Sequence, residues 1–230
     1  MIDKPFIKNL GILSESQQQS IHKQNIIVVG CGGIGGYVAT QLVRLGVSKI
    51  ILVDFDTFDR TNLNRQLYAT KHTIGQLKVD VLANELHNIH PAVTITTYNQ
   101  SIEDVSPQQL QGATYLVDGV DTPQTKVYLN QLATTLDIPL VHGACAGWYA
   151  QVGIIEPGCM LLQEVYQTQT SGIEQTLQNA AFVPALTASY MVSEWLKHLI
   201  NDTSKTTNQL LLIDCKNNTI DYSGRRDFDD

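Results

Sequence analysis

The chain has 230 residues, of which 43% are hydrophobic and 16% charged, so it can bury a sizeable core within one α/β domain spanning residues 1–230. Its formal net charge of -7 argues against broad binding of nucleic acid or anionic membranes, because phosphate contacts need clustered Lys and Arg. No stretch approaches the roughly 20 apolar residues that span a bilayer. The four cysteines form no CxxC pair, which suggests neither a disulfide framework nor a tetrathiolate zinc site. We therefore expect a soluble protein of the reducing cytoplasm.

In chain order, the first expected element is a short polar helix from Ser14 to about Lys23, where Ser14 and Gln17 have the spacing of a capping box. Short apolar or β-branched runs then predict strands at 26–30, 49–54, 93–97, 114–118 and 139–143. The segments between them predict helices at 34–46, 75–89 and 122–136. This alternation predicts a Rossmann-like, mostly parallel sheet with helices on both faces.

After residue 143 the alternation changes. The segment AQVGIIEP predicts a further strand, and a polar stretch from Gln163 to Gln178 predicts a loop or crossover. A helix is expected from about Pro184 to Ile200, with an apolar face suited to the core or to a subunit contact, formed by Ala188, Val192, Trp195 and Leu199. Two closing strands, NQLLLID and TIDY, are joined by the turn CKNN and predict a C-terminal extension of the sheet.

The first strand leads into a glycine-rich turn, GCGGIGG, which contains Gly30, Gly32, Gly33 and Gly35. A helix that starts near Ile34 would direct free backbone N–H groups and its positive dipole end at this turn, where a phosphate would sit. Asp54, at the end of the second strand, is placed to accept hydrogen bonds from a ribose hydroxyl. The pattern predicts a nucleotide-binding site but does not distinguish between a nicotinamide cofactor, a flavin cofactor and ATP. The structural alternative is a tight turn without a ligand.

The residues after Asp54 separate these options. The segment DFDTFDRTNLNRQLY places Asp56, Asn62, Arg65 and Gln66 beyond the second strand, and IGQLKVD brings Lys78 into the first turns of the next helix. Attack on a phosphorus atom needs cations beside the pyrophosphate because negative charge builds there, whereas a dehydrogenase does not need them. Taken alone, Lys78 could equally well be a solvated helix residue. The alternative for Arg65 alone is that it forms a surface ion pair. Together they favour a triphosphate site.

A further site is expected at the end of the fourth strand, YLVDGVDTPQTK. Asp118 and Asp121 flank a Gly-Val turn before a helix that Thr122 could cap. Carboxylates at this edge, facing a triphosphate, would hold Mg²⁺, a hard ion that prefers oxygen ligands. The structural alternative is that Asp118 ends a strand and Asp121 caps a helix.

The motifs GCGGIGG, VDFDTFDRTNLNRQ, IGQLK, VDGVD and PLVHGACAG, in this order and spacing, resemble the ThiF/MoeB/HesA family, relatives of the ubiquitin-activating enzymes. The resemblance runs from about Ile7 to Tyr222. It implies an enzyme that binds ATP and Mg²⁺ and adenylates the C-terminal glycine carboxylate of a small ubiquitin-like protein, with release of pyrophosphate. Such proteins are commonly sulfur carriers for thiamine or molybdopterin synthesis. ATP is therefore the expected nucleotide.

The resemblance also implies residue roles. Gly33 would contact ATP, Asp54 the ribose and Asp121 the Mg²⁺ ion. The phosphates would be held by Lys78 and by the run Thr61, Asn62, Leu63, Asn64 and Arg65. We expect Arg65, Lys78 and Asp121 to be catalytic, while Gly30, Gly32, Gly35, Asp56, Gln66 and Thr122 complete the nucleotide site. The resemblance further implies a homodimer, in which Lys8 stands where members often carry an Arg that reaches into the neighbouring subunit's site.

Three departures from the family pattern matter. Many members bind zinc through two CxxC pairs, but this chain keeps only Cys159 of the first pair, so we expect no structural zinc. Residues 160–183 hold no cysteine that could take up sulfur or form a thioester. Lys8 replaces the N-terminal Arg. Cys31 and Cys145 are expected to be small buried thiols, and His142 a packed histidine without a catalytic role.

Three other functions stay open. One is a nicotinamide-dependent oxidoreductase on the same fold. Another is a non-catalytic member that has lost its chemistry. The third is a family member that adenylates a small molecule or a tRNA-linked carboxylate, as the dehydratases of modified tRNA threonine do.

Overall fold

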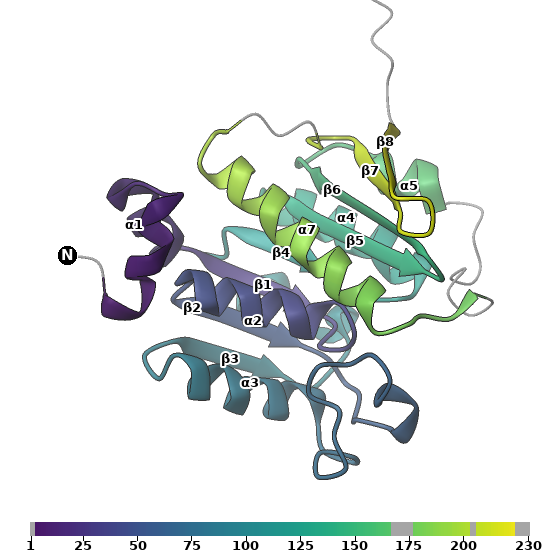
Figure 1. Ribbon diagram of the computed structural model, residues 1–230, viewed down its shortest axis with the longest axis horizontal. Coiled ribbons are helices and arrows are strands. Elements are labelled where there is room, and N and C mark those ends of the chain that lie inside the picture. Colours follow the sequence, from purple (N-terminus) through teal and green to yellow (C-terminus); the bar gives the residue numbers. More distant parts are fainter. Residues whose placement is uncertain (1–2, 167–176, 203–205, 224–230) are drawn as a thin grey trace, which may run out of the picture.

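An eight-stranded sheet in the order β3-β2-β1-β4-β5-β6-β7-β8 forms the centre of the computed structural model, which describes residues 3–166, 177–202 and 206–223 (Figure 1). The parallel strands are β1 (Asn25–Val29), β2 (Lys49–Val53), β3 (Thr94–Tyr98), β4 (Tyr115–Asp118) and β5 (Leu140–Ala146). The antiparallel strands are β6 (Tyr149–Ile155), β7 (Leu210–Asp214) and β8 (Thr219–Ser223). The mostly parallel sheet and its C-terminal extension are therefore confirmed.

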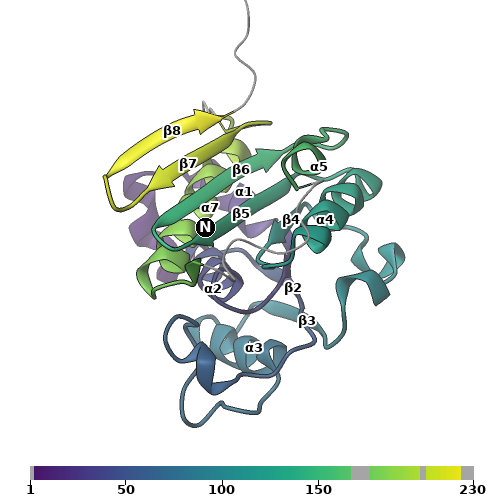
Figure 2. The ribbon, with the colours of Figure 1, turned by 90° about the vertical axis from the view of Figure 1, so that its right-hand side faces the viewer.

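Helices cover both faces of this sheet, as predicted. They are α1 (Glu15–His22), α2 (Gly35–Leu45), α3 (Lys78–Ile89), α4 (Pro123–Leu136), α5 (Leu161–Tyr166) and α7 (Phe182–Leu199). α2, α3 and α7 pack on one face, whereas α4 and α5 pack on the other (Figures 1 and 2). None of the helices in the described ranges has both the length and the apolar character to cross a membrane.

The inner strands form because their apolar runs are buried on both faces, as is usual for parallel strands. In β1 and in β2 every residue except the first is buried. α2 ends at Gly46, whose φ of 104° places it in the left-handed region that a helix C-cap requires. The predicted capping box of α1 is also confirmed, because Ser14 Oγ accepts from the Gln17 backbone and the Gln17 side chain accepts from the Ser14 backbone.

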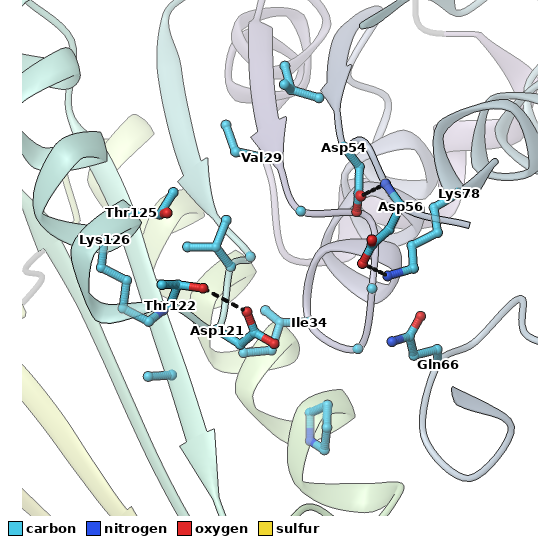
Figure 3. A pocket seen from close by; sticks show the side chains of 18 of the residues that line it. Val29, Ile34, Asp54, Asp56, Gln66, Lys78, Asp121, Thr122, Thr125 and Lys126 are labelled. Atoms are coloured by element: carbon cyan, nitrogen blue, oxygen red, sulfur yellow. Dashed lines mark hydrogen bonds and ion pairs between the residues drawn. The ribbon is translucent and has the colours of Figure 1, made fainter. Parts of the chain in front are cut away.

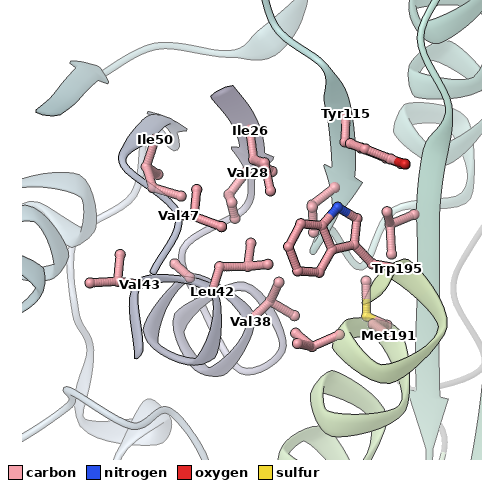
Figure 4. Close-up of a cluster of buried hydrophobic side chains, with 14 of the residues drawn as sticks. Ile26, Val28, Val38, Leu42, Val43, Val47, Ile50, Tyr115, Met191 and Trp195 are labelled. Atoms are coloured by element: carbon pink, nitrogen blue, oxygen red, sulfur yellow. The ribbon is translucent and has the colours of Figure 1, made fainter. Parts of the chain in front are cut away.

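The predicted apolar face of α7 belongs to the core. Ala188, Val192 and Trp195 are buried, and Leu199 packs against the same cluster while partly buried. Trp195 meets the ring of Tyr115 on β4 edge to face, with centroids 6.1 Å apart, and Val38 and Leu42 of α2 belong to the same cluster (Figure 4). α7 therefore joins the antiparallel part of the sheet to α2, the helix that follows the glycine turn.

Several predicted boundaries were wrong. α3 begins at Lys78 rather than 75, because residues before it pair with an earlier segment: Ile74 bridges to Phe58 and Leu77 to Thr57. Gly75, with a φ of 83°, lies in the turn between these bridges. α7 begins at Phe182, two residues before Pro184. The predicted loop from Gln163 overlaps α5, and residues 167–176 of that stretch lie outside the described residues.

Candidate functional site

A cavity of about 370 Å³ opens beyond the carboxyl ends of β1, β2 and β4 (Figure 3). β1 lies between β2 and β4, so the strand order reverses at this point, which is where open parallel sheets bind ligands. Most of the predicted site residues line the cavity: Gly30, Gly32, Gly33, Asp54, Asp56, Arg65, Gln66, Lys78, Asp121 and Thr122. The fold thus brings together residues from four separate segments of the sequence.

The glycine turn is the tightest part of this site. Gly30 has a φ of 83°, and a Cβ there would lie 2.6 Å from the Gly119 carbonyl oxygen. A Cβ on Gly35 would lie 1.7 Å from the Gly30 carbonyl oxygen, so both positions require glycine. Gly35 is therefore needed for the turn, although it does not line the cavity. α2 begins without a side-chain cap while Gly33 and Ile34 line the cavity, an arrangement that suits a phosphate.

Asp54 is fixed at the end of β2 by two backbone donors. Its Oδ2 accepts from the N–H of Cys31 at 2.6 Å, and its Oδ1 accepts from the N–H of Asp56 at 2.8 Å. Burial raises the pKa of Asp54, although the charge of Lys78 and the two N–H groups act to lower it. Each carboxylate oxygen keeps a second lone pair for a hydroxyl group such as that of a ribose.

Lys78 is held at the cavity by the chain that precedes it. Its ammonium lies 2.8 Å from Asp56 Oδ2, and its backbone N–H donates to the Asp56 carbonyl. The Lys78 side chain is only 8% exposed, whereas that of Asp56 is 55% exposed. The reading of Lys78 as a solvated helix residue is therefore wrong.

Arg65 lines the same cavity without a carboxylate partner in the described part of the chain. Its Nη1 donates to the Thr61 carbonyl at 3.0 Å and to Asn64 Oδ1 at 2.9 Å. These two acceptors are neutral, so they orient the guanidinium without compensating its charge. Among the described residues Arg65 therefore forms no surface ion pair.

Gln66 is buried beside the glycine turn. A Cβ on Gly32 would lie 3.3 Å from Gln66 Nε2, so the amide packs against the backbone of the turn. Among the described residues, the buried Gln66 Oε1 has no hydrogen-bond partner, and other atoms of Gln66 line the cavity.

Four other predicted residues, in the segment before Arg65, do not line the cavity: Thr61, Asn62, Leu63 and Asn64. Asn62 Oδ1 accepts from the Asp59 N–H as part of the capping box at the start of a short 3-10 helix, Arg60–Asn62. Asn64 Nδ2 donates to the Asn179 carbonyl at 3.0 Å, which ties this segment to the chain before α7. These residues shape the segment that carries Arg65, and direct contact with phosphates stays a prediction for them.

The two carboxylates at the end of β4 differ completely. Asp118 is fully buried: both its oxygens lie 3.1 Å from Lys126 Nζ, and Oδ2 lies 2.7 Å from His142 Nδ1. Burial acts to raise the pKa of Asp118, but the charge of Lys126 and the hydrogen bond from His142 outweigh it, so the pKa is lowered. The structural alternative is correct for Asp118, and the prediction of His142 as a packed histidine is also correct.

Asp121, in contrast, is exposed and lines the cavity. The N-cap of α4 is Thr122 rather than Asp121, and the Thr122 hydroxyl makes no capping bond but donates to Asp121 Oδ1 at 3.3 Å. The capping alternative for Asp121 is therefore wrong, whereas Thr122 occupies the N-cap position as predicted, without a side-chain capping bond.

The described residues contain no cluster of three or more His, Cys, Asp and Glu side chains suited to a metal. Mg²⁺ usually takes only one or two carboxylates and completes its shell with water and substrate phosphates. The exposed carboxylate of Asp121 fits that requirement. The expectation of no structural zinc stays a prediction.

The N-terminal segment lies away from the cavity. Lys8 is exposed in a 3-10 helix, Lys4–Gly11, whose Phe6 packs against the ring of His90. In the same segment Asn9 Nδ2 donates to the Leu45 carbonyl, at the end of α2 remote from the glycine turn. Lys8 therefore does not reach the site of its own chain, and its role in a neighbouring subunit stays a prediction.

Several cavity residues were missed from the sequence, among them Lys126, Asn179 and Pro184. Lys126 follows the N-cap Thr122 by one helical turn, a spacing that could have placed it near the strand end. Asn179 and Pro184 arrive from more than 50 residues beyond β4 and give no local signal. Cys145 also lines the cavity and is only partly buried, whereas Cys31 is buried as predicted, and burial raises its pKa well above the usual range.

Several known proteins are similar to this chain. The tRNA threonylcarbamoyladenosine dehydratase of Bacillus subtilis (strain 168) is 33% identical over 175 residues, which cover 75% of this chain and 67% of that protein. The molybdopterin-synthase adenylyltransferase of Salmonella typhimurium is 33% identical over 138 residues, 60% of this chain and 55% of that protein. Ubiquitin-like modifier-activating enzyme 5 of Bombyx mori is 29% identical over 218 residues, 84% of this chain and 55% of that protein. The chain thus spans between 55% and 67% of the length of these relatives.

Among solved structures, that of E. coli MccB with ATP has the same fold, with a TM-score of 0.82 and 20% identity over 99% of this chain and 74% of that one. The sequence model described as the ThiF family matches residues 7–227, nearly the whole chain. The predicted enzyme type, an ATP-dependent adenylyltransferase, is confirmed at the level of the family. On these grounds the chain belongs to the ThiF family.

Proposed function

We propose that the whole chain acts as one adenylation domain, which uses ATP to activate the C-terminal glycine carboxylate of a small ubiquitin-like carrier protein. The observation that carries this proposal is the cavity itself, where two cations, Lys78 and Arg65, share the walls with the glycine turn, Asp54 and Asp121. A site for hydride transfer has no need of these cations. Sulfur transfer for thiamine or molybdopterin synthesis is the proposed setting.

The reaction follows from positioning and charge. The carrier carboxylate, already ionised at neutral pH, attacks the α-phosphorus in line, so that a new P–O bond forms as the bond to pyrophosphate breaks. No general base is required. Asp54 orients the ribose, while Lys78 and Arg65 stabilise the charge that develops on the phosphoryl oxygens and the leaving pyrophosphate.

Lys78 can serve in this way because its partner is accessible. Asp56 is more than half exposed, so its carboxylate can turn toward water while the ammonium stays at the cavity. Asp121 is the residue that would hold Mg²⁺, and the Thr122 hydroxyl orients it. The ion, when bound, neutralises charge on the phosphate oxygens.

ATP–pyrophosphate exchange tests this function. We expect exchange with candidate carriers that end in glycine, and no exchange with the same carriers lacking the terminal glycine. Equal exchange with the shortened carriers would show that the carboxylate comes from elsewhere.

A second candidate substrate is a tRNA-linked carboxylate. The observation in its favour is the 33% identity with a relative named tRNA threonylcarbamoyladenosine dehydratase. The net charge of -7 weighs against RNA as a partner. The same exchange assay, run with tRNA bearing a carboxylate-modified nucleoside, distinguishes the two, because only one class of acceptor should support exchange.

We also propose a homodimer in which Lys8 acts on the partner's triphosphate. Lysine would supply a point charge there without the bidentate fork of arginine. Mixing Lys8→Ala chains with Asp121→Ala chains should then restore part of the exchange activity, because some mixed dimers hold one intact site. No recovery, with subunit exchange demonstrated, would remove Lys8 from the site.

A further inference from the structure

A buried polar cluster stands directly behind the β4 edge of the cavity. Its centre is Asp118, which contacts Lys126 Nζ through both oxygens at 3.1 Å and His142 Nδ1 through Oδ2 at 2.7 Å. His142 Nε2 lies 3.2 Å from Gln151 Nε2, and Gln151 in turn contacts the Tyr166 hydroxyl. Burial lowers the pKa of His142, although its hydrogen bond to Asp118 acts to raise it. Because a carboxylate accepts, Nδ1–H donates to Asp118 Oδ2. We call Asp118, Lys126 and His142 the buried triad.

Lys126 lines the cavity but does not present its charge to a ligand. An ammonium has three donors, and here they meet Asp118 Oδ1, Asp118 Oδ2 and the Gly143 carbonyl, the last at 2.9 Å. The side chain is only 3% exposed. Figure 3 shows it extending from α4 beside Thr122. Lys126 therefore cannot act as Lys78 does, by neutralising phosphate directly.

The bonds of Lys126 instead join two walls of the cavity. Asp118 Oδ1 also accepts from the N–H of Val120, in the turn that leads to Asp121. Gly143 lies midway along β5 and precedes Ala144 and Cys145, which line the cavity. One ammonium thus ties the turn before Asp121 to the middle of β5.

Residues 119–121, which form the turn after β4, also contact the glycine turn. The Gly119 N–H donates to the Val29 carbonyl at 2.8 Å, and a Cβ on Gly119 would lie 2.7 Å from the Gly30 carbonyl oxygen. There is no room between the two backbones, so displacement of residues 119–121 would shift Asp121 and the glycine turn together.

We propose that Lys126 is a positioning residue: through the buried triad it holds the turn of residues 119–122 so that Asp121 meets the metal carried by the nucleotide. The proposal rests on the proposed function for the identity of the ligand, Mg²⁺ with ATP. Groups that orient a metal ligand from behind commonly change metal affinity or activity by about 10- to 100-fold when removed.

Calorimetric binding of ATP, measured once with Mg²⁺ and once with EDTA, tests this role without any acceptor carboxylate. For Lys126→Met we expect the gain in ATP affinity on adding Mg²⁺ to fall by about tenfold, in addition to any loss of affinity in EDTA that movement of the glycine turn causes. Lys126→Arg should retain most of the gain, because the cation and its bonds to Asp118 can persist. The matched control is Leu132→Ala, which removes buried packing from the same helix without contacting Asp118.

Lys126→Met leaves Asp118 as an unpaired buried charge and can fail to fold. A double variant, Asp118→Asn with Lys126→Met, removes both charges while keeping the shape of the cluster. It should fold and still lose the Mg²⁺-dependent gain, because the tether to Gly143 is gone.

An unchanged Mg²⁺-dependent gain in the double variant, or an equal loss in Leu132→Ala at matched stability, would overturn the positioning role. Failure of the proposed function looks different: the wild-type protein would bind ATP with Mg²⁺ yet show no pyrophosphate exchange with any carrier. In that event the binding comparison among the variants still decides the role of Lys126.

Discussion

Two lysine–aspartate pairs stand at the same edge of the sheet, Asp56–Lys78 after β2 and Asp118–Lys126 after β4. In both pairs the lysine is buried, but Asp56 is 55% exposed whereas Asp118 is fully buried. Water can replace Lys78 as the partner of Asp56, so a ligand can recruit the Lys78 charge at little cost. Separation of the second pair would leave a bare charge in the core. The same two residue types thus form a pair with an exposed carboxylate at one strand end and a fully buried pair at the other.

Removal of one member of the buried Asp118–Lys126 pair should destabilise the fold. We expect Asp118→Ala to lower the free energy of unfolding by about 3 to 5 kcal/mol, because Lys126 keeps a buried charge without its carboxylate. Urea unfolding measures this directly. A loss below about 1 kcal/mol would mean that water enters beside Lys126 and that the two pairs are less different than their burial indicates.

Loss of the lysine from the Asp56–Lys78 pair should instead impair activity. Lys78→Met is expected to lower the rate of ATP–pyrophosphate exchange by about 10²- to 10³-fold, as for the loss of one group that stabilises developing charge. Methionine fills a similar volume, and Asp56 can be solvated, so the thermal unfolding midpoint should change little. A large fall in that midpoint with an unaltered exchange rate would reverse the assignment of the two lysines.

His142 allows the buried triad to be examined by pH. Burial lowers its pKa from the ordinary value of 6.5, although Asp118 acts to raise it. As the pH falls below about 6.5, the unfolded chain binds a proton at this residue that the folded chain does not, so the folded state loses stability. The slope from one such group is at most about 1.4 kcal/mol per pH unit. In urea unfolding between pH 7.5 and pH 5, His142→Asn should show a shallower loss than the wild type, and an identical slope would contradict this.

The smallest effect is expected for Asp56→Asn. The amide oxygen can still accept from Lys78, and an exposed ion pair is worth about 0 to 1 kcal/mol. ATP affinity should therefore weaken by less than about fivefold in calorimetric titration. A loss of about 100-fold would show that Asp56 itself holds the nucleotide and that its pairing with Lys78 is secondary.

The parts of the site that the sequence predicted are those governed by local patterns. Gly30 and Asp54 each follow an apolar strand, and parallel strands bring their carboxyl ends to one edge, so the neighbourhood of these residues could be inferred. The start of α3 could not, because residues 74–77 pair with residues 57–58 across an intervening loop that carries no periodic signal.

The interaction partners of the charged residues were the features of the site that the sequence predicted least well. Asp118 and Asp121 are three residues apart and equally acidic in sequence, and only the packing of Lys126 and His142 shows which of them is buried. Asn179 and Pro184 reach the cavity through tertiary contacts that no spacing indicates. The fold class and the location of the strands in the sequence are thus accessible from the hydrophobic pattern, whereas the different environments of the carboxylates depend on which side chains cover them.

The position of α7 also has a consequence for synthesis of the protein. Pro184 enters the cavity about 150 residues after the glycine turn, and α7 covers the face of the sheet on which α2 packs. At about 5 to 20 residues per second, a ribosome needs roughly 8 to 30 s to bridge that interval. Once Asp121 has been synthesised, the nascent chain carries most of the residues that line the cavity, but Val38 and Tyr115 still lack the packing of Trp195 against them. The cavity is therefore incomplete until the last quarter of the chain has been synthesised. A chaperone that shields apolar surface would act during this interval.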